Sequence, residues 1–131
     1  MAKIVIYEDS ENDLISRYAG LTKNHDVYVR HERRGNFGPS SLRWDYGDKR
    51  FKINGFNTDN FQNGYGDPSQ ESADVYFLDG LRGFCLEIIE KLPKERAFIN
   101  TDSSSIIQEA KQRGYNVVEG SVKDIVSRFS M

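Results

Sequence analysis

Short apolar runs alternate along this chain with segments of helical periodicity. A β-branched run at residues 3–7 (KIVIY) precedes a segment at 9–21 whose apolar residues recur at helical spacing, and the same succession returns from residue 74 onward. Strands separated by helices need crossover connections, which favour a parallel sheet covered by helices on both faces. We expect strands at 3–7, 25–31, 75–78, 96–100 and 115–120, and helices at 9–21, 83–92, 104–114 and 121–129.

The length and composition are typical of a single domain. The chain has 131 residues, of which 37% are hydrophobic and 12% aromatic, and this is enough to form one core. We therefore expect one α/β domain over residues 1–131, with an insertion at about 32–72 where the alternation stops.

The charge balance and the cysteine content restrict the partners and the compartment. Lysine and arginine total 18 against 20 acidic residues, so a net charge of −2 provides no general attraction to nucleic acid or to anionic lipid. Cys85 is the only cysteine, and it cannot form an internal disulfide. No apolar run is long enough for a signal peptide or a membrane span, and we expect a cytoplasmic protein without a membrane partner.

Polar side chains follow three of the expected strands. Glu8 and Asp9 follow the first strand, Asp79 follows the strand at 75–78, and residues 100–102 (NTD) follow the next one. In parallel sheets, ligands bind beyond the carboxyl ends of the strands, near the point where the strand order reverses. Neighbouring carboxylates repel one another unless a cation lies between them, and oxygen ligands suit Mg²⁺. The alternative for each single acid is that it only caps a helix.

Two segments resemble the receiver domains of response regulators, which have a flavodoxin-like fold. KIVIYEDSENDL at 3–14 is similar to the receiver opening, and DVYFLDG at 74–80 is similar to the strand that ends in the phosphoacceptor aspartate. The resemblance covers about the first thirty residues and the last sixty. It implies a doubly wound, five-stranded parallel sheet in the order 2-1-3-4-5.

The resemblance also implies roles for individual residues. Asp79 would be the phosphoacceptor, and Thr101 would be the switch hydroxyl. A weakly held Mg²⁺ would be the cofactor, because receiver-like sites leave much of its coordination sphere to water. The implied metal ligands are Glu8, Asp9, Asp79 and the backbone carbonyl of Leu81.

The chain departs from the receiver pattern at the end of the fifth expected strand. Receivers have a lysine there that binds the phosphoryl group, whereas this chain has Glu119 and Gly120, and Lys123 lies inside the following helix. Arg82, in the loop after Asp79, is a candidate replacement for the missing charge. These departures favour, as an alternative, a pseudo-receiver that binds its partner without phosphorylation.

The insertion at 32–72 replaces the second helix of a typical receiver. Residues 41–53 (SLRWDYGDKRFKI) alternate around a turn and are typical of a β-hairpin, and residues 54–72 are expected to form a loop. Cations interleave with aromatic residues in the hairpin, as they do in partner-binding surfaces. The alternative is a solvated hairpin with one face packed on the domain. The candidate partner-binding residues are Arg43, Trp44, Arg50 and Lys52.

Three classes of function follow from these observations. The first is a stand-alone receiver-like signalling module that docks to a kinase, a phosphotransfer protein or a regulated target, and it is not expected to be an enzyme. A haloacid-dehalogenase-type phosphatase ranks lower, because that family needs a second aspartate where this chain has Leu81. An adaptor that binds nucleic acid or protein through the hairpin is the third, although the net charge makes nucleic acid a poor partner.

Overall fold

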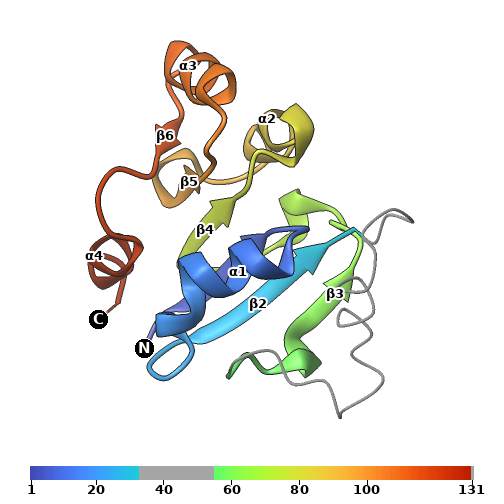
Figure 1. The fold of residues 1–131 in the computed structure, drawn as a ribbon, viewed down its shortest axis with the longest axis vertical. Helices are drawn as coiled ribbons and strands as arrows, with labels where there is room; N and C mark the ends of the chain where they lie inside the picture. The colour runs from blue at the N-terminus through green and yellow to red at the C-terminus, as the bar shows by residue number, and fades with distance from the viewer. Residues whose placement is uncertain (33–54, 131) are drawn as a thin grey trace.

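The computed structural model describes residues 1–32 and 55–130, which form one parallel α/β sheet with helices on both faces (Figure 1). The strands lie in the order β3-β2-β1-β4-β5-β6, and every neighbouring pair is parallel. This confirms the expected single α/β domain architecture. The strands are β1 (Lys3–Tyr7), β2 (Asp26–His31), β3 (Phe61–Asn63), β4 (Val75–Leu78), β5 (Ala97–Ile99) and β6 (Asn116–Val117).

Each expected helix is present, and each is shorter than its sequence pattern. Serine side chains cap the first turns: Ser10, Ser103 and Ser121 accept hydrogen bonds from backbone N–H groups three residues further on. The helices are α1 (Glu11–Tyr18), α2 (Cys85–Ile89), α3 (Ser104–Gln112) and α4 (Val122–Ser127). Short 3₁₀ turns lie at η1 (Ala19–Leu21), η3 (Thr58–Asn60), η4 (Pro68–Gln70), η5 (Leu81–Gly83) and η6 (Lys94–Arg96).

The expectation of five strands in the order 2-1-3-4-5 was wrong, because a sixth strand forms within the expected loop at 54–72. The segment Phe61–Asn63 pairs with β2 in the register Val29 to Phe61 and becomes the edge strand β3. Only Phe61 is buried, and the next two residues are exposed, so the sequence shows no alternation to detect. The five expected strands keep their relative order within the larger sheet.

The predicted hairpin at 41–53 lies outside the described residues. The same is true of the candidate partner-binding residues Arg43, Trp44, Arg50 and Lys52. The described part of the insertion, residues 55–72, contains β3 and 3₁₀ turns but no α-helix.

Successive side chains of the central strands enter two different cores. From β1, Ile4 and Ile6 face the layer formed by α1 and α4, while Val5 and Tyr7 face the layer that contains α2 and α3. Strands that are buried on both faces have continuous apolar sequences, which explains the runs IVIY and VYFL. The sheet is therefore doubly wound, and the edge at the carboxyl ends of its strands is where polar groups emerge.

The connection from β3 to β4 crosses the sheet on the face of α2. The ring of Tyr65 lies edge-on to Tyr7, with a centroid distance of 6.2 Å, and it stacks on Phe84 at 5.6 Å. An ion pair of 2.8 Å between Arg30 Nε and Glu71 Oε1 holds the connection against β2. The described end of the insertion is thus part of the domain and reaches the carboxyl edge of the sheet.

None of the described helices is both long enough and apolar enough to cross a membrane.

Candidate functional site

The strand order reverses between β1 and β4, and two acids follow these strands. Glu8 follows β1 directly, and Asp79 follows β4. A hydrogen bond of 2.9 Å from the Asp79 N–H to the carbonyl of Tyr7 extends the pairing of the two strands to this point. The side chain of Glu8 is fully buried, whereas that of Asp79 is 23% exposed. Two predicted site residues therefore lie side by side at the switch point of the sheet, where ligands bind in such folds.

A third acid, Asp13, joins them from the first turn of α1. Ligand oxygens of Glu8, Asp13 and Asp79 lie within 4.8 Å of one another, so these residues can hold a metal ion. Three carboxylates form an oxygen-only donor set, which suits Mg²⁺. Asp13 was not among the predicted ligands. It reaches the strand ends because Ser10 caps α1 only three residues after β1 ends.

Asp9, which the receiver resemblance implies as a metal ligand, is directed away from this acidic group. Its Oδ1 accepts a hydrogen bond of 2.8 Å from the N–H of Glu32. Its Oδ2 accepts one of 2.6 Å from the hydroxyl of Tyr65. Asp9 therefore ties the end of β1 to the segment after β2 and to the β3–β4 connection.

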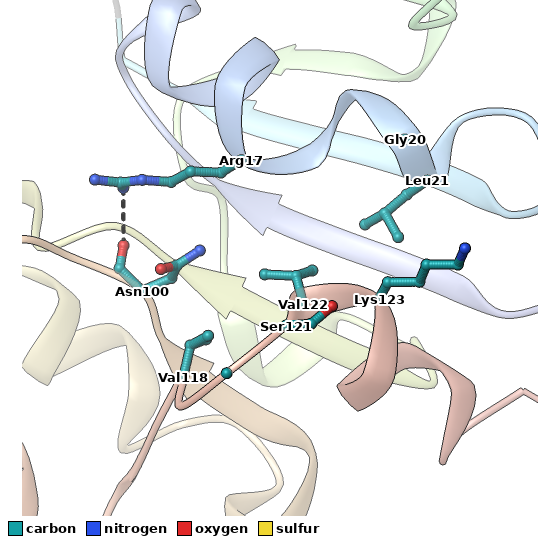
Figure 2. Close-up of a pocket in the computed structure, with 9 residues that line it drawn as sticks. Arg17, Gly20, Leu21, Asn100, Val118, Ser121, Val122 and Lys123 are labelled. Carbon is teal, nitrogen blue, oxygen red and sulfur yellow. Dashed lines mark hydrogen bonds between the residues drawn. The ribbon is translucent and has the colours of Figure 1, made fainter.

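Arg17 of α1 places a cation among the acids. Its Nη1 donates to Glu8 Oε1 at 3.4 Å, to Asp79 Oδ1 at 3.1 Å and to the carbonyl of Asn100 at 2.9 Å. Its Nη2 donates to Asp102 Oδ2 at 3.0 Å. Figure 2 shows the Arg17 side chain extending from α1 to the Asn100 carbonyl. One guanidinium thus links the ends of β1, β4 and β5.

Sequence reasoning missed Arg17 because it looked for a cation at the end of the fifth expected strand. The available signal was the spacing of Asp13 and Arg17, which are four residues apart and therefore share a face of the helix. A helix that begins beside an acidic strand end directs this face toward the acids. This spacing indicates that Arg17 lies near Asp13, but it does not indicate the contacts of Arg17 with Asp79 and Asn100.

The Glu8 carboxyl has a strongly raised pKa. The pKa is raised from 4.5 to about 9, chiefly by burial and further by the negative charge of Asp79, while Arg17 opposes the rise. Glu8 is therefore protonated at neutral pH, and its contact with Arg17 is a hydrogen bond to a neutral group. Metal binding to this carboxyl would have to release its proton, so the affinity would depend on pH.

Thr101 and the loop after Asp79 pack closely together. A Cβ added to Gly80 would lie only 2.8 Å from Thr101 Oγ1, so the absence of a side chain at Gly80 permits this approach. The Thr101 hydroxyl accepts a hydrogen bond of 3.2 Å from the Ser103 N–H. The predicted switch hydroxyl therefore lies beside the backbone that follows the predicted acceptor.

The loop after Asp79 has an unfavourable backbone conformation. Leu81 and Arg82 have φ values of +49° and +58°, and Gly83 follows at +94°. The left-handed region costs a residue with a side chain about 1–2 kcal/mol. The carbonyl of Leu81, an implied metal ligand, accepts a hydrogen bond of 3.0 Å from the Phe84 N–H. Strained residues concentrate at functional sites, and this strain adjoins Asp79.

Comparisons of the chain with protein-family models, curated proteins and solved structures found no match. The parallel sheet with alternating helices is consistent with the flavodoxin-like fold that the receiver resemblance implies. Functional inference therefore depends on the geometry of the acidic group and Arg17.

Proposed function

We propose that this chain is a receiver-like regulatory module in which Asp79 accepts a phosphoryl group and which acts by docking to a protein partner. The observation that supports this most is the 3.1 Å contact between Arg17 Nη1 and Asp79 Oδ1. It provides a cation beside the acceptor, although Glu119 and Gly120 stand where receivers have their lysine. In this proposal Arg17 takes the part of the missing lysine.

The side chain of Asp79 is partly exposed, so a small phosphoryl donor can reach it. With acetyl phosphate, a carboxylate oxygen attacks phosphorus, the bond from phosphorus to the acetyl oxygen breaks, and acetate leaves with the electron pair. The negative charge on the phosphoryl oxygens is stabilised by the guanidinium of Arg17. Because Glu8 is protonated at neutral pH, it does not add a negative charge that would repel the donor.

The acidic group also fits a weakly bound Mg²⁺. Glu8, Asp13 and Asp79 would hold the ion, which would supply further neutralisation of the phosphoryl oxygens. Two features of the chain weaken this binding: Arg17 already contacts two of the three acids, and Glu8 must lose a proton. We therefore expect slow and incomplete phosphorylation.

An exposed aromatic residue beside the site supports docking to a protein. Phe84 follows the strained loop, is 42% exposed and stacks on Tyr65. Aromatic residues are enriched at the centres of protein interfaces. The partner classes remain a kinase, a phosphotransfer protein or a regulated target.

A second candidate is a pseudo-receiver that docks without phosphorylation, and the Arg17 contacts favour it as well. Arg17 and the protonated Glu8 together reduce repulsion within the acidic group without a metal ion. In this case the acids and Arg17 would hold the protein in the conformation that binds its partner, whether or not Asp79 is phosphorylated.

Acetyl phosphate separates the two candidates. We expect a slow, Mg²⁺-dependent mass increase of one phosphoryl group on the wild type. The increase should be absent in Asp79→Asn and retained in the control Asp59→Asn, because Asp59 is an exposed acid with no recorded contact to Arg17. Intact-protein mass spectrometry over time measures the mass increase in the wild type and in the two variants.

A wild type that shows no adduct, and no shift of its amide resonances with beryllofluoride, would exclude Asp79 as an acceptor and leave the pseudo-receiver. An adduct that persists in Asp79→Asn would place the modification on another residue and contradict the proposal.

A further inference from the structure

A groove of about 440 Å³ lies between α1 and the segment that joins β6 to α4. Figure 2 shows the residues that line it, with Arg17, Gly20 and Leu21 on one wall and Val118, Ser121, Val122 and Lys123 on the other. Its volume is within the range of small-molecule sites, about 300–1,000 Å³. Apart from Arg17 and Asn100, its lining residues have no part in the acidic group described above.

The two charged side chains that line the groove, those of Arg17 and Lys123, are both cations, and the Arg17 guanidinium also contacts three of the acids described above. None of its described lining residues is acidic, although the chain has a net charge of −2. The side chains of Arg17 and Lys123 extend to opposite ends of the groove (Figure 2). Between them lie the apolar side chains of Leu21, Val118 and Val122. A matching ligand therefore has an organic body and a negative charge at each end.

Both cations have hydrogen-bonding capacity left for a ligand. Lys123 forms no ion pair with a described residue. The guanidinium of Arg17 has five N–H groups. Among the described residues, its Nε–H and one N–H of Nη2 have no acceptor, because the recorded bonds come from Nη1 and, once, from Nη2.

Gly20 gives a second, independent indication that the groove is a binding site. It lies in the 3₁₀ turn η1 and does not have a positive φ, so its backbone does not require glycine. A Cβ built on Gly20 would have no atom within 4 Å, so the surrounding packing does not require glycine either. Glycine in a helical turn is less stable than alanine by about 0.5–1 kcal/mol. Its effect here is to leave one wall of the groove without a side chain.

We propose that this groove binds a small organic bisphosphate, with one phosphate at Arg17 and the other at Lys123. The proposal goes beyond the function proposed above and does not depend on phosphorylation of Asp79. It does connect the two sites, because a phosphate at Arg17 competes with Asp79 for the same guanidinium. Occupation of the groove would therefore change the charge beside the candidate acceptor.

Isothermal titration calorimetry with fructose bisphosphate, fructose monophosphate and inorganic phosphate tests this inference. We expect the bisphosphate to bind at least tenfold more tightly than either comparison ligand, because two charge-assisted contacts form instead of one. Lys123→Gln should weaken bisphosphate binding about tenfold, to the level of the monophosphate. The control is Lys91→Gln, which removes an exposed lysine that follows α2 and does not line the groove, and it should leave binding unchanged.

Gly20→Met provides a steric test, because an unbranched side chain is compatible with the turn and extends into the groove. It should abolish binding while thermal stability is maintained, since the position of its Cβ is open. Asp79→Asn should still bind the bisphosphate, and this separates the groove from the proposed phosphorylation.

The inference is overturned if the bisphosphate binds no better than inorganic phosphate. Equal weakening by Lys91→Gln and Lys123→Gln would also overturn it, because the attraction would then be a general charge effect.

Discussion

Arg17 and Asp79 form an ion pair of 3.1 Å that joins α1 to the end of β4. The two residues are 62 positions apart in the chain, and among the described residues Arg17 alone forms ion pairs with the acids of the candidate site. The ion pair connects the stability of the fold with the proposed phosphorylation. The same guanidinium lowers the repulsion within the acidic group and would contact a phosphoryl group on Asp79.

Replacement of Arg17 by methionine should destabilise the fold by about 2–3 kcal/mol, because it leaves the partly buried Asp79 without a counter-charge and the buried Glu8 without a hydrogen-bond partner. Arg17→Lys should recover part of the loss, since it keeps the charge but cannot reach several acceptors at once. Urea denaturation measures both variants. If Arg17→Met retained wild-type stability, the guanidinium would be a peripheral contact rather than a structural link.

Stability should fall as the pH rises through the range in which Glu8 is protonated only in the folded state. Its pKa is about 9 in the folded protein and about 4.5 when unfolded, so the folded state binds more protons between these values. The Glu8 contribution is complete below pH 4.5, decreases by up to about 1.4 kcal/mol per pH unit and is lost above pH 9.

Glu8→Gln is the matching variant for this pH dependence, because it is neutral at every pH. Its denaturation midpoint should depend less on pH than that of the wild type, and it should be the more stable protein near pH 8. Glu87→Gln, on the exposed part of α2, is the control and should follow the wild type. Parallel pH profiles for wild type and Glu8→Gln would contradict a raised pKa.

Magnesium binding should depend on Asp13 rather than on Asp9. Asp13→Asn removes an oxygen ligand from the acidic group and should abolish the Mg²⁺-induced shifts of the Asp79 and Gly80 amide resonances. Asp9→Asn should retain these shifts, since Asp9 binds Glu32 and Tyr65 instead. The affinity should also rise between pH 7 and 9 as the Glu8 proton is lost more easily. If Asp9→Asn abolished the shifts and Asp13→Asn retained them, Asp9 would be the metal ligand, as the receiver resemblance implies.

Relief of the strain in the loop after Asp79 should stabilise the protein. Arg82→Gly removes the Cβ at a residue with a φ of +58° and should raise the free energy of unfolding by about 1 kcal/mol. Arg82→Ala removes the same charge but keeps the Cβ, and it should not stabilise. Equal effects of the two substitutions would attribute the change to charge and not to backbone conformation.

The edge strand β3 should depend on a single side chain. Phe61→Ala empties a buried position that contacts Phe56 and should cost about 3 kcal/mol. Gln62→Ala, at the next and exposed position of the same strand, should change stability by less than about 0.5 kcal/mol. Similar effects at both positions would mean that β3 is not packed as described.

The sequence by itself determined the elements whose signals lie within a few residues. Apolar runs such as IVIY, helical spacing in α1 and serine caps depend on neighbouring residues, and they predicted the parallel sheet and each α-helix of residues 1–32 and 55–130. Glu8 and Asp79 were predicted together for the same reason, since residues that follow parallel strands must meet at one edge of the sheet.

The tertiary structure decided the remainder, because the deciding contacts join residues far apart in the chain. β3 has only one buried side chain and exists through its pairing with β2, which no local pattern encodes. Arg17 lies 9, 62, 83 and 85 residues from its hydrogen-bonding partners, and Asp9 lies 56 residues from Tyr65. Which acid takes part in the site, and which cation balances it, is fixed only when folding brings these residues within hydrogen-bonding distance.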